Sequence, residues 1–139
     1  MKMVVENLTK EKLPGGLRVQ FWLAKCLELL AASVDEGGRE VLSHGTGEEV
    51  IELNFVKAEE IRRLNKHFRQ IDKVTDVLSF SFLGRGSFPG DKYLVGQIFI
   101  EPVTATKQAA EHGVTLREEI EFLFVHALLH VFGYDHETE

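Results

Sequence analysis

The chain has 139 residues, and its content of 44% hydrophobic and 27% charged residues is that of an ordinary soluble globular protein, not of a disordered, collagen-like or coiled-coil chain. This length predicts one domain, residues 1–139, that buries roughly two-thirds of its extended surface. The net charge of −6 argues against wholesale electrostatic binding of nucleic acid, and no DNA partner is expected.

The first half of the chain alternates between strand-like and helix-like patterns. The predicted elements are a short strand at Val4–Val5, a helix over Leu17–Ala32, a strand over Val50–Val56 and a helix over Ala58–Phe68. In the first helix Leu23, Leu27 and Leu30 fall three and four positions apart, which places them on one apolar stripe. Between Val50 and Val56 the hydrophobic pattern has period two, as in a strand with one buried face.

The helix over Ala58–Phe68 is followed by a second strand pattern. Ile61, Leu64 and Phe68 give this helix its apolar spacing. The strand covers Thr75–Phe82 and sends Phe80 to one face and Ser79 to the other, because successive side chains of a strand alternate.

The C-terminal third contributes one more strand and two helices. The predicted elements are a strand over Leu94–Ile100, a helix over Val103–His112 and a last helix that runs to Phe132. Gly113 ends the first of these helices. Thr115 and Glu118 have the spacing of a capping box at the start of the last helix. Gly133 stands where a left-handed residue would end it.

The interleaving of strands and helices predicts an α+β fold. We expect a small mixed sheet of about four strands, covered by helices. The glycine-rich segment 84–90 lacks the following helix and the lysine of a phosphate-binding loop, so we interpret it as a hairpin connection between two strands.

Nothing in the sequence indicates secretion or a membrane. Cys26 is the only cysteine, so no internal disulfide requires an oxidising compartment. No apolar run approaches the roughly 18 residues of a membrane span. The N-terminus reaches Glu6 and Asn7 too early for the apolar region of a signal peptide. We therefore expect a cytoplasmic protein without a membrane partner.

One short segment departs from the acidic character of the chain. Between Arg62 and Lys73 there are five cations and one anion, a local charge of 5 − 1 = +4, so the remainder carries −6 − 4 = −10. The cations are Arg62, Arg63, Lys66, Arg69 and Lys73, and the anion is Asp72. Such a segment can receive a phosphate locally without coating the protein in RNA.

Three of the six histidines lie within eleven residues near the C-terminus. His126 and His130 are four positions apart on the last predicted helix, so both imidazoles lie on one face and can reach one ion. His136 follows the helix-ending Gly133 and can approach the same ion from another direction. Three neutral nitrogens leave a fourth tetrahedral position open for water, as in catalytic zinc sites. The alternative is a chance spacing of ordinary, partly buried histidines.

A zinc peptidase is the obvious rival, because a helical His-x-x-x-His is the hallmark of that class. In the peptidase motif a glutamate follows the first histidine and acts as general base. Here that position is Ala127, which has no proton-transfer chemistry. The peptidase interpretation is therefore weakened.

Two motifs stand out in this chain. The first is the run from His126 to His136, HALLHVFGYDH, and the second comprises Leu64-Asn65, Arg69, Asp72 and the run TDVLSF at 75–80. Together they resemble the YbeY family of metal-dependent endoribonucleases, whose signature is His-Gly-x-Leu-His-Leu-x-Gly-Tyr-Asp-His. The order of elements is similar from about Val50 to the end, which is two-thirds of the chain.

The sequence departs from the family pattern at a few positions. Ala127 and Val131 replace a glycine and a leucine, which leaves the histidines unaltered. Gln97 stands where the family commonly has an aspartate after a glycine, so this chain has no carboxylate at that position to act beside the metal.

The resemblance implies an α+β fold, one zinc ion per chain on His126, His130 and His136, and endonucleolytic cleavage of single-stranded RNA. It also implies a role in ribosomal RNA maturation and ribosome quality control, with ribosomal RNA and ribosomal proteins as partners. Arg69 would then pair with the scissile phosphate, because a guanidinium offers two parallel donors. The alternative for Arg69 is an ordinary surface arginine or one in a salt bridge, for which Asp72 is a possible partner.

Three further residues are weaker candidates for contact with substrate or with the ligand histidines. They are Asp76, Ser79 and Asp135. Each also has an ordinary structural interpretation: Asp76 can shape a strand entrance, Ser79 can fill its face of the sheet and Asp135 can hold a turn. Glu119, two turns before His126, is a similar candidate for orienting a ligand.

Two classes of function stay open. One is a ribonuclease or related phosphodiesterase, which the open fourth ligand position favours. The other is a ribosome-associated factor whose zinc is chiefly structural, which the acidic body of the chain favours.

Overall fold

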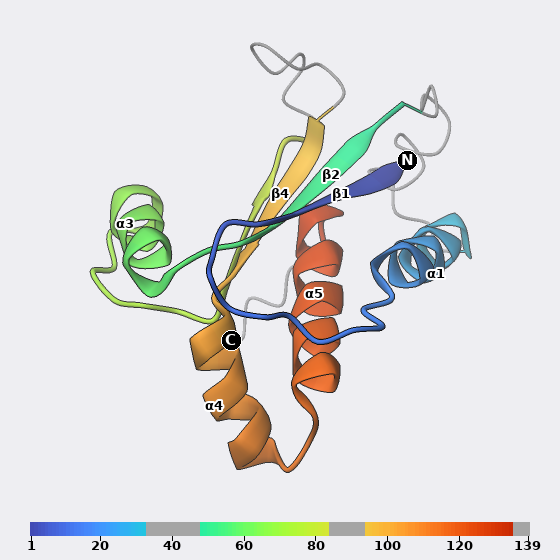
Figure 1. Ribbon diagram of the computed structural model, residues 1–139. Coiled ribbons are helices and arrows are strands. Elements are labelled where there is room, and N and C mark those ends of the chain that lie inside the picture. The colour runs from blue at the N-terminus through green and yellow to red at the C-terminus, as the bar shows by residue number, and fades with distance from the viewer. Residues whose placement is uncertain (33–47, 84–93, 135–139) are drawn as a thin grey trace.

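The computed structural model describes residues 1–32, 48–83 and 94–134. Its elements are β1 (Lys2–Asn7), α1 (Val19–Ala32), β2 (Val50–Phe55), α3 (Ala58–Arg69), β3 (Val77–Ser81), β4 (Leu94–Ile100), α4 (Pro102–His112) and α5 (Leu116–Val131). Every element predicted from the sequence is present, and the predicted α+β fold is confirmed (Figure 1). Within the described ranges, no helix has the length and apolar character of a membrane-spanning segment.

The four strands form one mixed sheet in the order β1-β2-β4-β3. β2 runs parallel to β1 and to β4, whereas β3 and β4 are antiparallel. β3 is therefore an edge strand, with Phe80 opposite Gln97 of β4. Antiparallel pairing of these consecutive strands is what a hairpin connection requires, although segment 84–90 itself lies outside the described residues.

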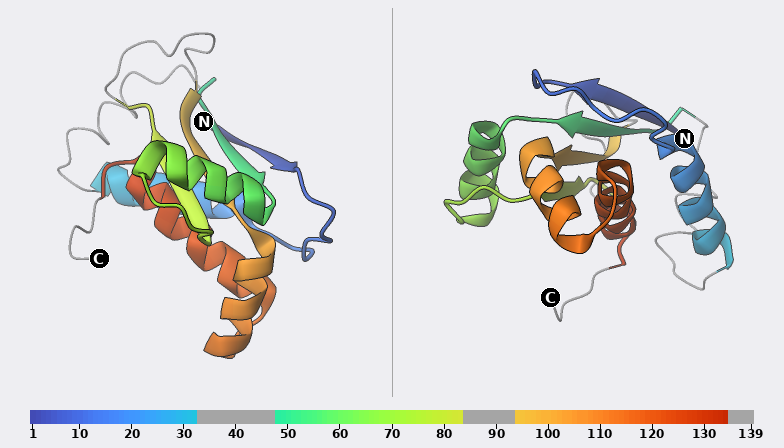
Figure 2. Two further views of the ribbon diagram at one scale, coloured as in Figure 1. Left: turned by 90° about the vertical axis from the view of Figure 1, so that its left-hand side faces the viewer. Right: turned by 60° about the horizontal axis from the view of Figure 1, so that its bottom comes forward.

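The two faces of the sheet carry two apolar clusters. The larger cluster packs the sheet against α1 and α5, and its fully buried strand residues are Ile51, Leu53, Phe55, Ile98 and Ile100. The smaller cluster packs α3 against the sheet and comprises Val56, Ile61, Leu64 and Leu78, with Phe80 and Phe99 alongside. Figures 1 and 2 show α1 and α3 on opposite sides of the molecule, with α5 between them.

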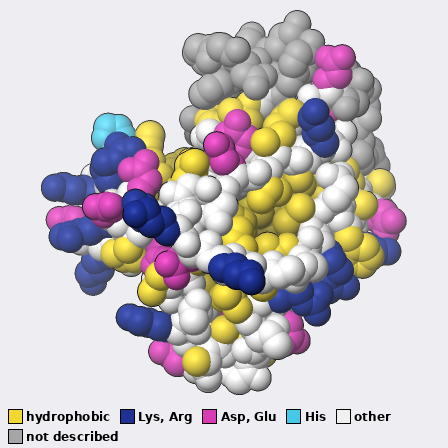
Figure 3. Space-filling model, viewed as in Figure 1, with side chains coloured by type: hydrophobic (Ala, Val, Ile, Leu, Met, Phe, Trp, Pro, Cys, Tyr) yellow, Lys and Arg dark blue, Asp and Glu magenta, His cyan; other side chains and the backbone are white. Residues whose placement is uncertain are grey.

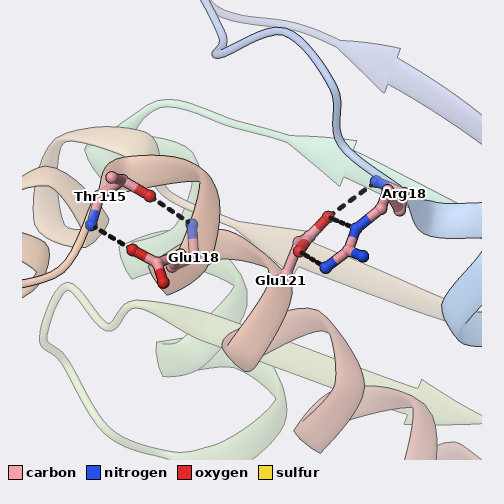
Figure 4. Close-up of polar contacts among 4 residues, drawn as sticks. All are labelled: Arg18, Thr115, Glu118 and Glu121. Carbon is pink, nitrogen blue, oxygen red and sulfur yellow. Dashed lines mark hydrogen bonds and ion pairs between the residues drawn. The ribbon is translucent and has the colours of Figure 1, made fainter.

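The sequence fixes both ends of α5 and its approach to the sheet. Thr115 Oγ1 accepts from the Glu118 amide at 3.1 Å, and the Glu118 carboxylate accepts from the Thr115 amide at 3.0 Å, so the predicted capping box is confirmed (Figure 4). Gly133 has the predicted positive φ, +95°. A Cβ on Gly96 of β4 would lie 2.7 Å from Val131 Cγ1, so only a glycine allows α5 to come this close.

A largely buried carboxylate ties the segment before α1 to α5. Arg18 donates to Glu121 from its backbone N (2.9 Å), its Nε (3.3 Å) and its Nη2 (3.0 Å) (Figure 4). The Glu121 side chain is 7% exposed and that of Arg18 is 47% exposed. The hydrogen bond from the Arg18 side chain is the main cause that lowers the pKa of Glu121 to about 2.

Replacing Glu121 with glutamine should destabilise the fold by about 1.5 kcal/mol, the lower end for a hydrogen bond to a charged group, because solvent screens the half-exposed Arg18. The folded pKa of Glu121, about 2, lies below the ordinary value of 4.5. The contribution is therefore fully present above pH 4.5 and is lost as the pH falls toward 2. Urea unfolding of both proteins across this range measures the difference.

The control for this experiment is Glu28→Gln. Glu28 forms an exposed pair with Lys25 at 3.5 Å, so its replacement should change the free energy of unfolding very little. A Glu121→Gln difference that is as large at pH 3 as at pH 7 would contradict the role of the ionised carboxylate.

Candidate functional site

His126 and His130 lie one turn apart on α5, as their spacing requires. His126 is exposed, and its ring stacks on that of Phe122 one turn earlier, with centroids 6.5 Å apart and planes 23° from parallel. His130 is half-buried. The helix therefore presents two imidazoles near its C-terminal end, one in solvent and one at the surface of the sheet.

The edge strand β3 holds His130. Ser79 is 8% exposed, and its Oγ lies 2.7 Å from Nδ1 of His130. Ser81, the next residue on the same face, donates to the backbone carbonyl of Val131 at 2.6 Å. These two serines attach the end of α5 to β3, and the contact at Nδ1 leaves Nε2 of His130 as the ring nitrogen for another ligand.

The donor chemistry fits a divalent ion such as zinc. Neutral imidazole nitrogens are preferred zinc ligands, and a ligand histidine normally has its other ring nitrogen hydrogen-bonded to a fixed partner. Ser79 is such a partner for His130. The predicted third ligand, His136, and the candidate Asp135 lie outside the described residues. Within 1–32, 48–83 and 94–134, no three His, Cys, Asp or Glu side chains are grouped for a metal, so a complete site requires a ligand beyond these ranges.

Arg69 ends α3 as an exposed side chain. Its predicted alternative partner, Asp72, is bound by Arg62 instead, with Nε and Oδ1 2.7 Å apart. This bond lowers the pKa of Asp72 and raises that of Arg62. Arg63 is likewise paired with Glu60, at 2.8 Å. In the part of the chain that the structure describes, no acidic group pairs with Arg69.

The structure does not bring every candidate to the histidines. Asp76 shapes the entrance to β3, where its Oδ1 accepts from the Val77 amide at 2.8 Å and from Thr75 Oγ1 at 3.3 Å. Glu119 is buried, and its Oε1 lies 2.8 Å from Nδ1 of His112, whose pKa this contact raises. Glu119 is therefore engaged by a histidine other than the predicted ligands.

Gln97, which stands in place of the family's aspartate, donates to Glu52 Oε1 at 2.8 Å. Its amide is therefore engaged with the neighbouring strand β2.

Asn65 belongs to the second sequence motif and has a structural role. The spacing of the motif did not predict that role. It is 4% exposed, its carbonyl accepts from the Ile71 amide at 3.3 Å, and its side-chain amide donates to the Lys73 carbonyl at 3.0 Å. Together with the Arg62–Asp72 pair, these bonds fasten the loop after α3 to the helix. The last turn of α3, which carries Arg69, is thereby held in one position.

Comparison with known proteins places the chain in a family. A family profile described as Endoribonuclease YbeY matches residues 18–139. Among curated relatives of that name, the Moorella thermoacetica protein is 42% identical over 98 residues, which cover 66% of this chain and 63% of the relative. The Francisella tularensis subsp. tularensis protein is 34% identical over 119 residues, 84% of this chain and 65% of the relative.

A solved structure agrees with this assignment. The solution structure of TM1509 from Thermotoga maritima matches 99% of this chain and 77% of its own, with a TM-score of 0.51 and 28% identity. The chain spans only 60–63% of the length of the curated relatives it matches first. Since the profile covers both the Arg69 and the histidine motifs, the chain belongs to the YbeY family.

Proposed function

We propose that this protein is a metal-dependent endoribonuclease that cleaves single-stranded RNA. The observation that carries the proposal is the pair of helical histidines with His130 fastened through Nδ1 to Ser79 of β3. Membership of a family whose members are named endoribonucleases supports it. Ribosomal RNA maturation and ribosome quality control in the cytoplasm, with ribosomal proteins nearby, belong to the same proposal.

His126, His130 and His136 would hold one zinc ion per chain through neutral ring nitrogens. Bound there, the ion supplies Lewis acidity for phosphodiester hydrolysis. Ser79 keeps the His130 ring in one orientation, so a ligand nitrogen needs no reorganisation when the ion binds. The open position of a three-histidine site favours this catalytic role over a purely structural one.

The protein offers a group of Lys and Arg side chains that would bind the phosphates of the RNA. Lys and Arg side chains gather over α3 (Figure 3), which overlaps the segment from Arg62 to Lys73 with its local charge of +4. Attraction to α3 would concentrate RNA beside β3. The helix α3 packs on one face of this strand, and Ser79 lies on the opposite face. Arg69 would bind the scissile phosphate through two parallel donors.

Purified protein should cleave single-stranded RNA in a reaction that a chelator stops, and it should leave peptide substrates intact. Ala127 is 2% exposed and offers no general base beside the metal, which removes the chemistry of the peptidase motif. His130→Ala should lose RNA cleavage. Incubation of labelled RNA and of a peptide library with and without chelator measures both activities.

Two results would reject this assignment. Chelator-sensitive proteolysis that His130→Ala abolishes would favour a peptidase. Wild-type protein that binds zinc and leaves RNA intact under every condition tested would favour a ribosome-associated factor with a structural metal.

A further inference from the structure

Phe68 is exposed although it continues the apolar stripe of α3. Ile61 and Leu64 on that stripe are 0% and 8% exposed, whereas Phe68 is 55% exposed. Ile71 and Val74, in the segment that follows α3, are 47% and 42% exposed. Three exposed apolar side chains within seven consecutive residues make this segment a candidate binding surface.

The Phe68 ring is held in place by aromatic neighbours. It packs edge-to-face against Phe80 of β3, with centroids 5.1 Å apart, and Phe80 packs in the same way against Phe99 of β4 at 5.9 Å. His67 contacts the Phe68 ring at 4.5 Å. The following loop is fastened through Asn65. A ring that is already oriented loses little conformational freedom when a second flat group stacks on it.

A cation lies next to this surface. Arg69 is the next residue along the helix and has no acidic partner in the described ranges. Lys66 lies two positions before Phe68 on another side of α3, where its charge acts on Asp72. The remainder of the chain carries −10, so this segment is where a polyanion is attracted. An exposed aromatic ring beside cations is how proteins bind single-stranded nucleic acid, with bases stacked on the ring and phosphates on the cations.

The edge strand β3 connects this surface to the histidines. Phe80 supports Phe68 on one face of β3, and the preceding residue, Ser79, contacts His130 on the other face. Since β3 is the last strand in the sheet order, no strand of the described sheet lies beyond it. One strand of RNA that crosses this edge can reach both features.

We propose that Phe68 is a base-stacking platform for an unpaired nucleotide of the RNA, with Arg69 on an adjoining phosphate. The proposal rests on the proposed nuclease function and adds a positioning residue to it. It also supplies a reason for single-strand specificity, because the bases of a duplex are already stacked on one another and cannot stack on Phe68.

The test is RNA affinity in the presence of chelator, where cleavage is absent. Phe68→Leu should raise the Kd for single-stranded RNA about fivefold or more, the lower end of the cost of losing one stacked base. Phe68→Tyr, which keeps the ring, should bind within about twofold of the wild type. Phe21→Leu is the matched control, because Phe21 is 44% exposed on the distant helix α1.

An oligonucleotide of the same length with abasic residues separates stacking from a structural effect. The wild type should bind it more weakly than normal RNA, and Phe68→Leu should weaken that binding no further. A normal Kd in folded Phe68→Leu, or an equal loss on the abasic strand, overturns the platform even if the wild type cleaves RNA. A wild type that neither binds nor cleaves single-stranded RNA rejects the nuclease function and the platform with it.

Discussion

His130→Ala protein should retain only a small fraction of the one equivalent of zinc that we expect in the wild type. Removing a ligand deprives the ion of one coordinating nitrogen. Mutation of a residue that only orients a metal ligand typically lowers metal affinity about ten- to a hundredfold, and loss of the ligand itself lowers it more. His126→Ala and His136→Ala should behave alike. Elemental analysis after dialysis against zinc buffer measures the content.

Ser79→Ala should lower the zinc affinity less than the loss of a ligand does. It removes the contact at Nδ1 of His130 without removing a ligand, so zinc affinity should fall about tenfold while saturation stays possible. His112→Ala is the control, because His112 is bound to Glu119 on the neighbouring helix. Full zinc content in all three ligand variants would end the assignment of the site.

Arg69→Ala should reduce the rate of RNA cleavage roughly ten- to a hundredfold, which corresponds to the loss of one charge-assisted contact of about 1.5–3 kcal/mol. The rate should fall more than the affinity if the guanidinium binds the phosphate most tightly in the transition state. Arg69→Lys should recover only part of the loss, because an ammonium lacks the two-pronged geometry. Single-turnover kinetics at saturating RNA measures this rate.

Arg63→Ala is the matched control for Arg69. Arg63 lies on the same helix and is exposed, and its guanidinium is already paired with Glu60. Its removal should weaken binding slightly and flatten the salt dependence, with the saturated rate nearly intact. If Arg69→Ala keeps its zinc, its fold and a full cleavage rate, Arg69 has no part in catalysis.

Local patterns in the sequence predicted the elements because these depend on short spacings, and the prediction of the metal ligands uses spacings of the same kind. The capping box at Thr115 and the left-handed Gly133 are of this kind, and so is the face that His126 and His130 share. The structure places His126 and His130 one turn apart on α5 as predicted, and the metal-ligand role of His126, His130 and His136 stays a prediction.

The remaining features depend on contacts between distant segments. The Ser79–His130 contact joins residues 51 positions apart, and no periodicity encodes it. Arg62 and Arg69 are both near Asp72 in sequence, and only the path of the loop after α3 decides which of them it binds. The apolar stripe of α3 predicts burial for Phe68, but its last turn is left uncovered.

The most direct test of the central claim is the rate of RNA cleavage as zinc is added back to metal-free protein. We expect the rate to rise in proportion to the zinc added and to level off at about one equivalent per chain. His130→Ala should stay inactive at the same additions. Full cleavage before any zinc is added, or equal rates for the wild type and His130→Ala, would contradict a metal-dependent nuclease built on this site.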